Sequence, residues 1–187
     1  MDDQPASTQP RIYTRRGDDG TTGLYFGGRR RKDDPVVEAY GAVDEAQAFM
    51  GVARAEAEPG SELDDLLVAL ERDLWTVMAE LATEPDNRPK LTDVMTPERV
   101  TELERRIDDL KARFALPAEF VVPGESRVAA SLDVARTVVR RAERHALAIA
   151  AEGSLVVPYL NRLSDLLWTM ARWQEGRSLP TRTKEPS

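Results

Sequence analysis

Ten residues near the start of the chain, Thr14 to Gly23 (TRRGDDGTTG), hold three glycines, three threonines, two arginines, two aspartates and no apolar side chain. A segment of this composition cannot be buried in a hydrophobic core. Its glycines allow several backbone N–H groups to converge on one anion, and the hydroxyls of Thr21 and Thr22 would add donors. The Walker A pattern is absent, so by itself the segment predicts either an anion-binding loop or a flexible connector.

A row of arginines further along the chain has the spacing of one helix face. Arg136, Arg140 and Arg144 are separated by one helical turn each. Like charges at this spacing destabilise a helix by about 0.2–0.5 kcal/mol per pair unless something neutralises them. The row is therefore either a solvated basic face or a set of guanidiniums that faces an anion or the carboxylates of another subunit.

A second basic cluster, Arg29 to Lys32, follows the glycine-rich segment. It could steer a phosphate group toward the loop, although solvation is the simpler interpretation of Arg30 and Arg31. The protein as a whole is acidic, with a formal net charge of −7, so general affinity for nucleic acid is disfavoured. Two local cationic clusters on an acidic protein indicate a compact anionic ligand.

The residue types that are missing exclude several chemistries. The chain has no cysteine, which excludes disulfides, zinc–thiolate sites and thiol nucleophiles, and its single histidine is His145. No apolar run approaches the ~20 residues that cross a bilayer, and residues 1–10 lack the apolar core of a secretion signal. We therefore expect a cytoplasmic protein that binds neither membrane nor nucleic acid.

The hydrophobic pattern predicts an all-α, five-helix bundle in a single domain. We expect helices over residues 35–57, 61–83, 96–114, 126–152 and 156–176, with negligible strand content. A structured loop region at 11–34 precedes them, so the domain spans 11–177. Residues 1–10 read as a disordered tail and residues 178–187 as a flexible one.

The predicted helices place polar groups beside their apolar stripes. On the fourth helix, Arg136, Arg140 and Glu143 lie on the flank of the core stripe. The fifth helix has a polar side opposite its leucines, formed by Asn161, Asp165, Trp168 and Arg172. Such a side is typical of a solvated face, and a single aspartate such as Asp44 on the first helix is usually solvated too.

Six motifs together resemble, in the right order, the signatures of the PduO-type ATP:cob(I)alamin adenosyltransferases. They are IYTRRGDDGTT at 12–22, KDDP at 32–35, EAYGAVDE at 38–45, FVVPG at 120–124, ARTVVRRAER at 135–144 and YLNRLSD at 159–165. The resemblance covers residues 11–172. It implies a ferritin-like five-helix bundle, preceded by a nucleotide-binding loop and assembled as a homotrimer with its active sites between subunits.

The activity that the resemblance implies is transfer of the 5′-deoxyadenosyl group of ATP to the cobalt of cob(I)alamin. Triphosphate would be the leaving group, and Mg²⁺ would be bound mainly through the ATP phosphates rather than by a metal site of the protein. A flavoprotein reductase and an adenosylcobalamin-dependent enzyme would be external partners.

The resemblance also implies a role for individual residues. One subunit would bind ATP through Thr14, Arg15, Arg16, Gly17, Thr22, Gly23 and Lys32. The neighbouring subunit would bind it through Arg140, Arg141, Glu143, Arg144 and Asn161. Asp44 would pair with Arg136 across the interface, and Phe120 would bind cobalamin beneath the corrin ring and displace the lower axial ligand. The catalytic group would then comprise Arg140, Asp44, Arg136 and Phe120.

The chain departs from the family pattern in a few places. Glu125 replaces the second glycine of a Pro-Gly-Gly turn, which predicts a different turn there. Arg15 and Arg16 replace a common Lys-Thr pair, Val139 a common cysteine, and Leu167 an aromatic residue. None of these three changes removes an implied ATP contact.

Three classes of function are compared on this basis. The first is the adenosyltransferase, the second a non-catalytic carrier or sensor of nucleotide and adenosylcobalamin, and the third a structural bundle without a ligand. The presence of Asp44, Arg136 and Arg140 favours the enzyme. A ligand-free bundle predicts a melting temperature indifferent to ATP, whereas a binder gains about 2.7 kcal/mol at a ligand concentration of 100 times Kd.

Overall fold

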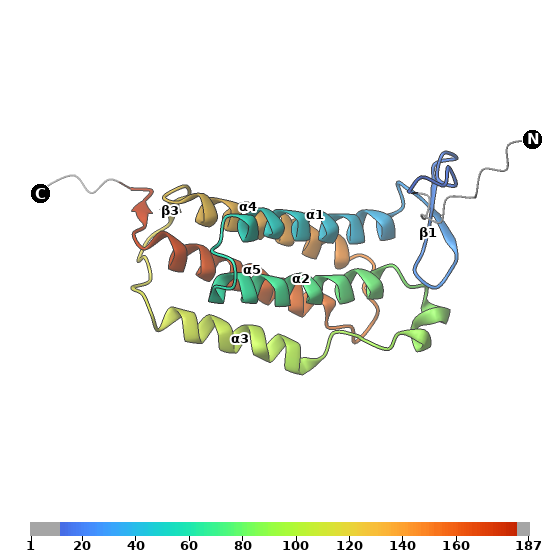
Figure 1. The fold of residues 1–187 in the computed structure, drawn as a ribbon. Helices are drawn as coiled ribbons and strands as arrows, with labels where there is room; N and C mark the ends of the chain where they lie inside the picture. The colour runs from blue at the N-terminus through green and yellow to red at the C-terminus, as the bar shows by residue number, and fades with distance from the viewer. Residues whose placement is uncertain (1–11, 183–187) are drawn as a thin grey trace, which may run out of the picture.

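A computed structural model describes residues 12–182 and confirms the all-α bundle that the sequence predicts. Figure 1 shows its five helices lying roughly side by side in an elongated bundle. Their bounds are Pro35–Ala55 (α1), Glu62–Leu81 (α2), Pro97–Lys111 (α3), Arg127–Ala146 (α4) and Val156–Glu175 (α5). The expected tail at 1–10 and the last part of the expected C-terminal tail, 183–187, lie outside the described residues.

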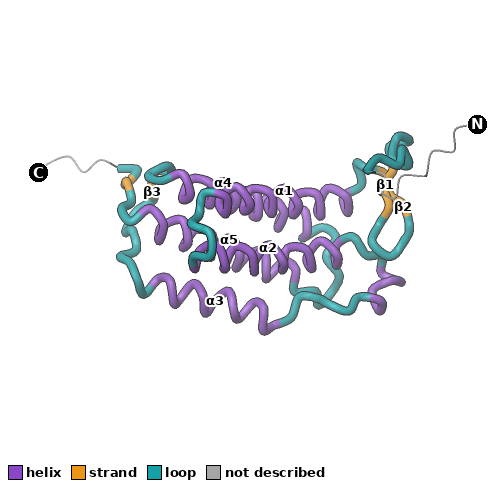
Figure 2. The backbone as a smooth tube through the Cα atoms, viewed as in Figure 1, coloured by secondary structure: helices purple, strands orange, loops and turns teal. Residues whose placement is uncertain are grey.

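The helices pack in a fixed order around one apolar core. α1 packs against α2 and α4, α4 packs against α5, and α3 packs against α5 at the edge of the bundle (Figure 2). The predicted core stripe of α4 is fully buried, including Leu132, Ala135 and Val139. None of the described helices combines the length and the apolar composition that crossing a membrane requires.

Side-chain caps explain where three of the helices begin. Asp34, Ser61 and Ser126 each stand just before a helix and accept a hydrogen bond from a backbone N–H of its first turn, at 2.9, 3.2 and 3.2 Å. Pro35 follows the first cap, where an N–H would have no intrahelical acceptor. Because these signals are local, the predicted helix starts agree closely with the structure.

The end of α4 differs from the expectation. The helix ends at Ala146 rather than near Glu152. The N–H groups of Ile149 and Ala150 donate back to the carbonyl of Ala146 at 3.1 and 2.8 Å, and Gly153 adopts a φ of +77°. The alanine-rich sequence favours a continued helix, but the chain must reverse here into α5, and tertiary context overrides helix propensity.

The expectation of negligible strand content misses two small antiparallel pairs. β1 (Thr21–Gly23) pairs with β2 (Arg29–Arg31), and β3 (Val121–Val122) pairs with β4 (Leu179–Pro180). Strands this short carry no readable alternation of apolar and polar residues. β4 lies in the segment that we expected to be a flexible tail, so residues 179–180 are paired instead. A 3₁₀ helix, Pro85–Lys90 (η1), lies in the predicted loop between α2 and α3.

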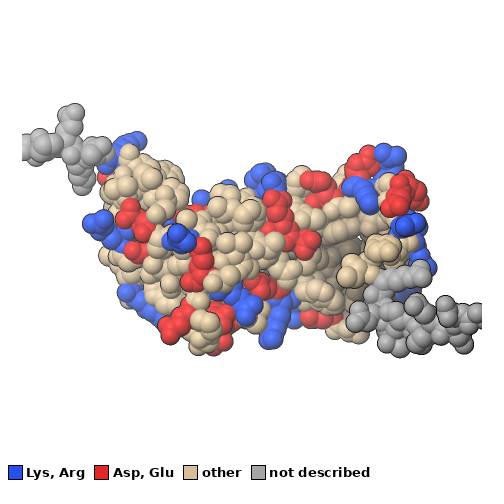
Figure 3. Space-filling model, turned by 45° about the horizontal axis from the view of Figure 1, so that its top comes forward, with Lys and Arg blue, Asp and Glu red and all other residues tan. Residues whose placement is uncertain are grey.

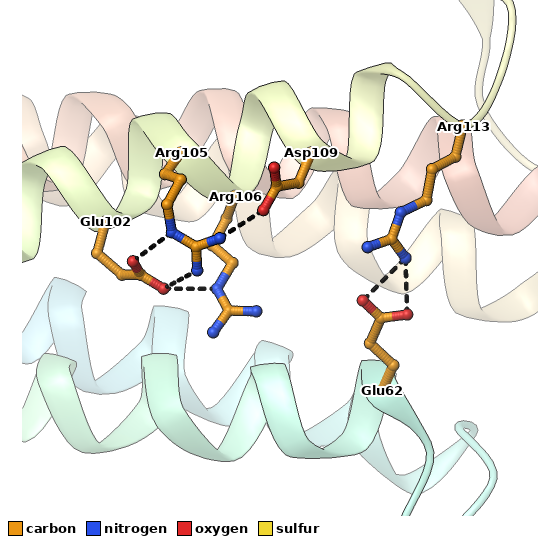
Figure 4. A network of polar contacts seen from close by, with 6 residues as sticks. All are labelled: Glu62, Glu102, Arg105, Arg106, Asp109 and Arg113. Atoms are coloured by element: carbon orange, nitrogen blue, oxygen red, sulfur yellow. Dashed lines mark hydrogen bonds and ion pairs between the residues drawn. The ribbon is translucent and has the colours of Figure 1, made fainter.

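Charged side chains form a network on the side of α3 that faces α2 (Figure 4). Just beyond α3, Arg113 pairs with Glu62 at the start of α2, at 2.8 Å. Within α3, Glu102 accepts hydrogen bonds from Arg105 at 2.7 Å and from Arg106 at 2.6 Å. These bonds, that from Arg105 first, lower the pKa of Glu102 to about 2.

The lowered pKa predicts a small pH dependence of stability. Since the folded pKa lies below the ordinary value of 4.5, ionised Glu102 stabilises the fold above that value and loses this effect as the pH falls toward about 2. The side chain is 45% exposed, so screening by water limits the expected effect to about 0.5 kcal/mol. A Glu102→Gln variant should therefore melt slightly below the wild type at neutral pH, with a difference that shrinks in acid. A difference that stays constant with pH would contradict this assignment.

Candidate functional site

The glycine-rich segment forms a loop that the β1–β2 hairpin closes at one end of the bundle (Figure 1). The N–H of Lys32 donates to the carbonyl of Gly20 at 2.9 Å and so ties the two sides of the loop together. The ammonium of Lys32 lies beside Gly17, where an added Cβ would come within 3.2 Å of Nζ. The loop is thus tight at Gly17, where a side chain would press on the lysine ammonium and, also at 3.2 Å, on the carbonyl oxygen of Thr21.

The backbone of the loop carries strain and unpaired donors. Arg15 has a φ of +61° and is the one described non-glycine residue in the left-handed region. Such strain is commonly found at functional sites. The N–H groups of Gly17 and Asp19 donate no hydrogen bond to any other described residue. An open hollow of about 550 Å³ is lined by Tyr13, Thr14, Arg15 and Arg16. These features fit an anion-binding loop.

The two threonine hydroxyls of the loop differ in availability. The Thr21 hydroxyl donates to the Asp19 carboxylate at 2.7 Å and accepts from Arg29 Nε at 3.0 Å. The hydroxyl and the N–H of Thr21 lower the pKa of Asp19, which keeps this carboxylate ionised. The Thr22 hydroxyl makes no hydrogen bond with another described residue. Of the two, Thr22 is therefore the one left to contact a ligand.

The protein itself neutralises three cations of the Arg29–Lys32 cluster. The pairs are Arg29–Asp19 at 3.6 Å, Arg30–Glu84 at 2.8 Å and Arg31–Asp33 at 2.7 Å. Lys32 forms no ion pair with a described residue. The three arginines thus hold the hairpin in place, and Lys32 keeps its charge available within the loop.

The arginines of α4 likewise fall into two groups, those that are paired with a carboxylate of the same chain and those that are not. Within the chain the pairs are Arg136–Asp133 at 3.3 Å and Arg141–Glu45 on α1. Arg140 and Arg144 are exposed and pair with no described carboxylate, although Arg144 donates to the carbonyl of Arg140 at 3.0 Å. Two like charges one turn apart are left without a neutralising group in the described chain, which favours an external anion over simple solvation.

Two further predicted ATP contacts meet where α4 and α5 pack. Asn161 Nδ2 on α5 donates to Glu143 Oε1 on α4 at 3.0 Å. The side-chain oxygen of Asn161, Oδ1, in turn accepts from Arg162 Nη1 at 2.7 Å. These bonds place Glu143 and Asn161 beside the unpaired arginines on the neighbouring turns of α4.

Asp44 and Arg136 do not meet within one chain. Asp44 is exposed on α1 and forms no ion pair with a described residue, while the carboxylate beside Arg136 is that of Asp133. The pairing that the sequence predicts therefore stays a prediction about two chains.

Phe120 lies at the other end of the bundle, beside β3, and is 89% exposed. It borders a hollow of about 500 Å³ lined also by Pro117, Asp133, Arg136, Trp168 and Arg172. A second hollow, of about 650 Å³, shares the wall formed by residues 117–119 and 121. An exposed phenylalanine at the mouth of a hollow is suited to contact a flat apolar ligand.

The sequence did not reveal the roles of three residues that shape this end of the molecule, Thr181, Arg172 and Asp133. Thr181 donates to the carbonyl of Phe120 twice, from its N–H at 2.9 Å and from its hydroxyl at 3.1 Å. Arg172 was expected on a solvated face, yet it is 2% exposed and bonded to Asp133 at 2.6 Å. A contact across 61 residues, or the burial of an arginine on the polar side of a helix, has no local signal that could have found it.

The turn after Phe120 accommodates the departure at Glu125 without strain. Gly124 has a φ of +119°, which requires glycine, whereas Glu125 is not among the described residues with positive φ. The Glu125 carboxylate lies 3.6 Å from Arg177. A side chain at position 125 is therefore compatible with this turn.

The glycine-rich loop ends in β1 and Phe120 directly precedes β3, and Figure 1 shows these two strands at opposite ends of the molecule. α1, which begins at the loop and runs to the other end, has 21 residues and is thus about 30 Å long at ~1.5 Å per residue. α4 runs back along it, with Arg136 at the hollow and Arg140 and Arg144 on successive turns toward the loop. Figure 3 shows acidic and basic side chains close together over the loop end of the molecule.

The sequence profile of the cobalamin adenosyltransferase family matches residues 12–174. A corrinoid adenosyltransferase from Citrobacter freundii is 42% identical over 168 residues, which cover 88% of this chain and 95% of the relative. A corrinoid adenosyltransferase from Mycobacterium tuberculosis is 44% identical over 168 residues, covering 87% of each protein. The solved structure of a phenylalanine-to-alanine variant of a PduO-type ATP:corrinoid adenosyltransferase from Lactobacillus reuteri, complexed with cobalamin and ATP, has a TM-score of 0.83 and 28% identity, covering 92% of this chain and all of that one.

Proposed function

This chain belongs to the cobalamin adenosyltransferase family and is an ATP-dependent corrinoid adenosyltransferase, and we propose that it works as a homotrimer with each active site between two subunits. One subunit supplies the glycine-rich loop, and its neighbour supplies the arginine row and the Phe120 hollow. The observation that carries the proposal is that the loop, which ends in β1, and the hollow, which includes Val121 of β3, lie at opposite ends of one chain.

The reaction requires the two substrates to touch. Reacting atoms must approach to about 3–3.5 Å, and the attacked 5′ carbon of ATP is bonded directly to the triphosphate. A triphosphate held in the loop of one chain therefore cannot present this carbon to a corrin ring at Phe120 of the same chain. The α4 helix offers the suitable alignment, because Arg140 and Arg144 continue the line that begins with Arg136 at the hollow. The glycine-rich loop of the neighbouring subunit would contact these arginines and so complete the site.

The unpaired side chains support the same arrangement. Asp44, Arg140, Arg144 and Lys32 have no ion-pair partner among the described residues of their own chain. An Asp44–Arg136 ion pair across the interface would fix the position of one subunit relative to its neighbour, as ion pairs do in other assemblies. The phosphates of ATP would neutralise Arg140, Arg144 and Lys32 together.

The reaction needs no activated nucleophile from the protein. The protein must instead position the two substrates and supply positive charge to the leaving triphosphate. The electron pair of Co(I) attacks the 5′ carbon of ATP, the cobalt–carbon bond forms, and the bond from that carbon to the triphosphate oxygen breaks. Cobalt is formally oxidised to Co(III), and the triphosphate leaves with the electron pair of the broken bond. Its charge grows in the transition state, so Lys32, Arg140 and the loop N–H groups stabilise the transition state more than bound ATP.

Mg²⁺ would be bound mainly through the ATP phosphates, because this ion keeps several waters and takes few protein ligands. Among the described residues, no group of three or more His, Asp or Glu side chains is arranged to hold a metal ion. Two nearby carboxylates are engaged within the chain, Asp19 by Thr21 and Asp33 by Arg31, whereas the carboxylate of Asp18 has no hydrogen-bond or ion-pair partner among the described residues.

Phe120 acts on the other substrate. Its exposed ring would cover the lower face of the corrin, exclude water and keep the lower axial ligand from returning. Loss of an axial ligand changes the potential of a metal centre, and here it would favour reduction to Co(I). The external partners in this scheme are a flavoprotein reductase that supplies the electron and an adenosylcobalamin-dependent enzyme that uses the product.

Mixed trimers test whether the sites are shared. Lys32→Ala damages the loop and Arg140→Ala damages the row, so each homotrimer should be nearly inactive. In trimers assembled from equal amounts of both, about a quarter of the interfaces join an intact loop to an intact row in a head-to-tail ring. Activity is followed without oxygen as the Co(I) absorbance is replaced by that of a light-sensitive alkylcobalamin. We expect recovery to roughly a quarter of the wild-type rate.

Co-purification on two different tags, together with native mass, shows whether mixed trimers have formed. Mixing two samples of the same variant is the matched control and should recover nothing. Mixed trimers of the right mass without recovery would show that each chain builds its own site, and a monomeric active protein would show the same.

A further inference from the structure

Three charged side chains are buried where α4 and α5 meet beside the Phe120 hollow. The exposed fractions of the Asp133, Arg172 and Glu175 side chains are 7%, 1% and 0%. Arg172 Nη2 donates to Asp133 Oδ2 at 2.6 Å, and Arg172 Nε lies 3.0 Å from Glu175 Oε1. The guanidinium also lies 5.8 Å from the centre of the Trp168 ring. One cation is thus held between two carboxylates and one aromatic face.

A buried cluster of charges is weak evidence for a stabilising role. Desolvating charged groups is costly, and well-packed apolar residues in their place often give an equal or greater stability. The cluster is also incompletely satisfied, because neither Arg172 Nε nor Glu175 Oε2 has a hydrogen-bond partner among the described residues. Its arrangement therefore points to a role beyond holding the helices together.

The cluster reaches the hollow through Asp133. One oxygen of this carboxylate, Oδ2, accepts from the buried Arg172, and the other, Oδ1, accepts from Arg136 Nε at 3.3 Å. The Arg136 side chain is 27% exposed and lines the hollow together with Phe120. A single buried carboxylate thus joins a guanidinium fixed in the core to a guanidinium on the wall of the hollow.

We propose that Asp133 is a positioning residue for Arg136 and that Arg172 holds Asp133 in place. The proposal rests on the function proposed above, in which Arg136 pairs with Asp44 of the neighbouring subunit beside the cobalamin. A long arginine side chain on an open wall has many accessible rotamers. Asp133 restricts the Arg136 guanidinium from the core side and leaves its remaining N–H groups directed toward the interface and the hollow.

The charges predict which group moves when Asp133 is neutralised. Arg136 and Arg172 would then share one neutral acceptor and repel each other. Arg172 remains held by Glu175 and Trp168, whereas Arg136 has no other described ion-pair partner in its chain. We therefore expect Arg136 to be displaced while the fold persists.

The test is Asp133→Asn, which keeps the shape of the side chain and one acceptor oxygen. We expect kcat/KM for cob(I)alamin to fall about 10- to 100-fold, the scale of a misplaced contact at a reacting centre. The fall should lie in KM for cob(I)alamin, with KM for ATP and the trimer mass unchanged. In an Arg136→Gln background the same change should have almost no further effect, because both changes remove one interaction. Asp108→Asn on α3, which removes an exposed pair with Lys111, is the matched control.

Two results would overturn the proposal. One is a lower melting temperature with both KM values unchanged, which a purely structural role predicts. The other is an equal loss in the Arg136→Gln background, which would separate Asp133 from Arg136. Should Asp133→Asn fail to assemble, Arg172→Lys decides, since lysine keeps the charge but lacks the planar guanidinium that lies between Asp133 and Glu175. The Arg172→Lys variant must then have a higher KM for cob(I)alamin, and an unchanged KM would contradict the proposal. The mixed-trimer experiment does not involve Asp133, so its failure is recognised separately.

Discussion

An Arg140→Ala variant should lose most of its activity and keep its fold, with kcat/KM for MgATP lowered about 100- to 1000-fold, the scale for removing one donor from developing negative charge. Arg140 is exposed on α4 and has no carboxylate partner among the described residues, so its loss leaves no buried group unpaired. Its contribution is to the bound triphosphate, and it increases as the charge of the leaving group increases. Initial rates at saturating cob(I)alamin measure the effect, and thermal melting shows whether the bundle is intact.

Two companion variants sharpen this measurement. Arg140→Lys keeps the positive charge and loses the planar fork, so an intermediate rate would indicate a bidentate contact with phosphate. Arg72→Ala removes an exposed arginine of α2 that forms no ion pair with a described residue, and it should behave as the wild type. Wild-type kinetics in Arg140→Ala would remove this residue from the ATP site, although the family assignment would stand.

A Phe120→Ala variant should also keep its melting temperature, because the ring is 89% exposed. A phenylalanine that becomes buried against a substrate contributes about 1.5–3 kcal/mol, which corresponds to a rate ~10- to 100-fold lower when it is removed. The loss should be larger when the reaction starts from cob(II)alamin and a reductant than when it starts from cob(I)alamin. The reason is that the ring would assist both the binding of the corrin and the removal of its lower ligand.

The two starting materials separate these contributions. An equal loss from both would mean that Phe120 only binds the corrin ring and has no part in exposing cobalt to reduction. Trp75→Ala, which removes another exposed aromatic ring on α2, is the control for a general effect of surface aromatics. An unchanged rate from cob(II)alamin in Phe120→Ala would contradict the proposed place of the corrin.

The helices and the basic groups could be predicted because their signals are local. Asp34, Ser61 and Ser126 have the side chains that cap a helix, and the structure uses each of them in that way. The core stripe of α4 follows from the helical period, since the residues that repeat with it are the ones that become buried. The arginine row on the same helix is fixed in direction by the same period.

The partners of these charges could not be predicted, because they come from segments far apart in the chain. Among similar cations, Arg30 is neutralised by Glu84 and Arg141 by Glu45, while Lys32 and Arg140 keep no described carboxylate partner. Which arginine is structural and which is left for a ligand depends on what the fold brings within about 3 Å. Composition and spacing make these cations look alike.

What the sequence by itself determined was the helical bundle, the order of its elements and the chemical types needed to bind a triphosphate, since caps, periodicity and glycine content act over a few residues. Only the tertiary structure decided that Arg172 is buried on Asp133, that Thr181 holds the carbonyl of Phe120, and that the loop lies at the opposite end from Phe120. These three facts depend on the packing of α4 against α5 and on the return of the C-terminal segment to β3. A contact between residues distant in the chain forms only after the core has placed them side by side.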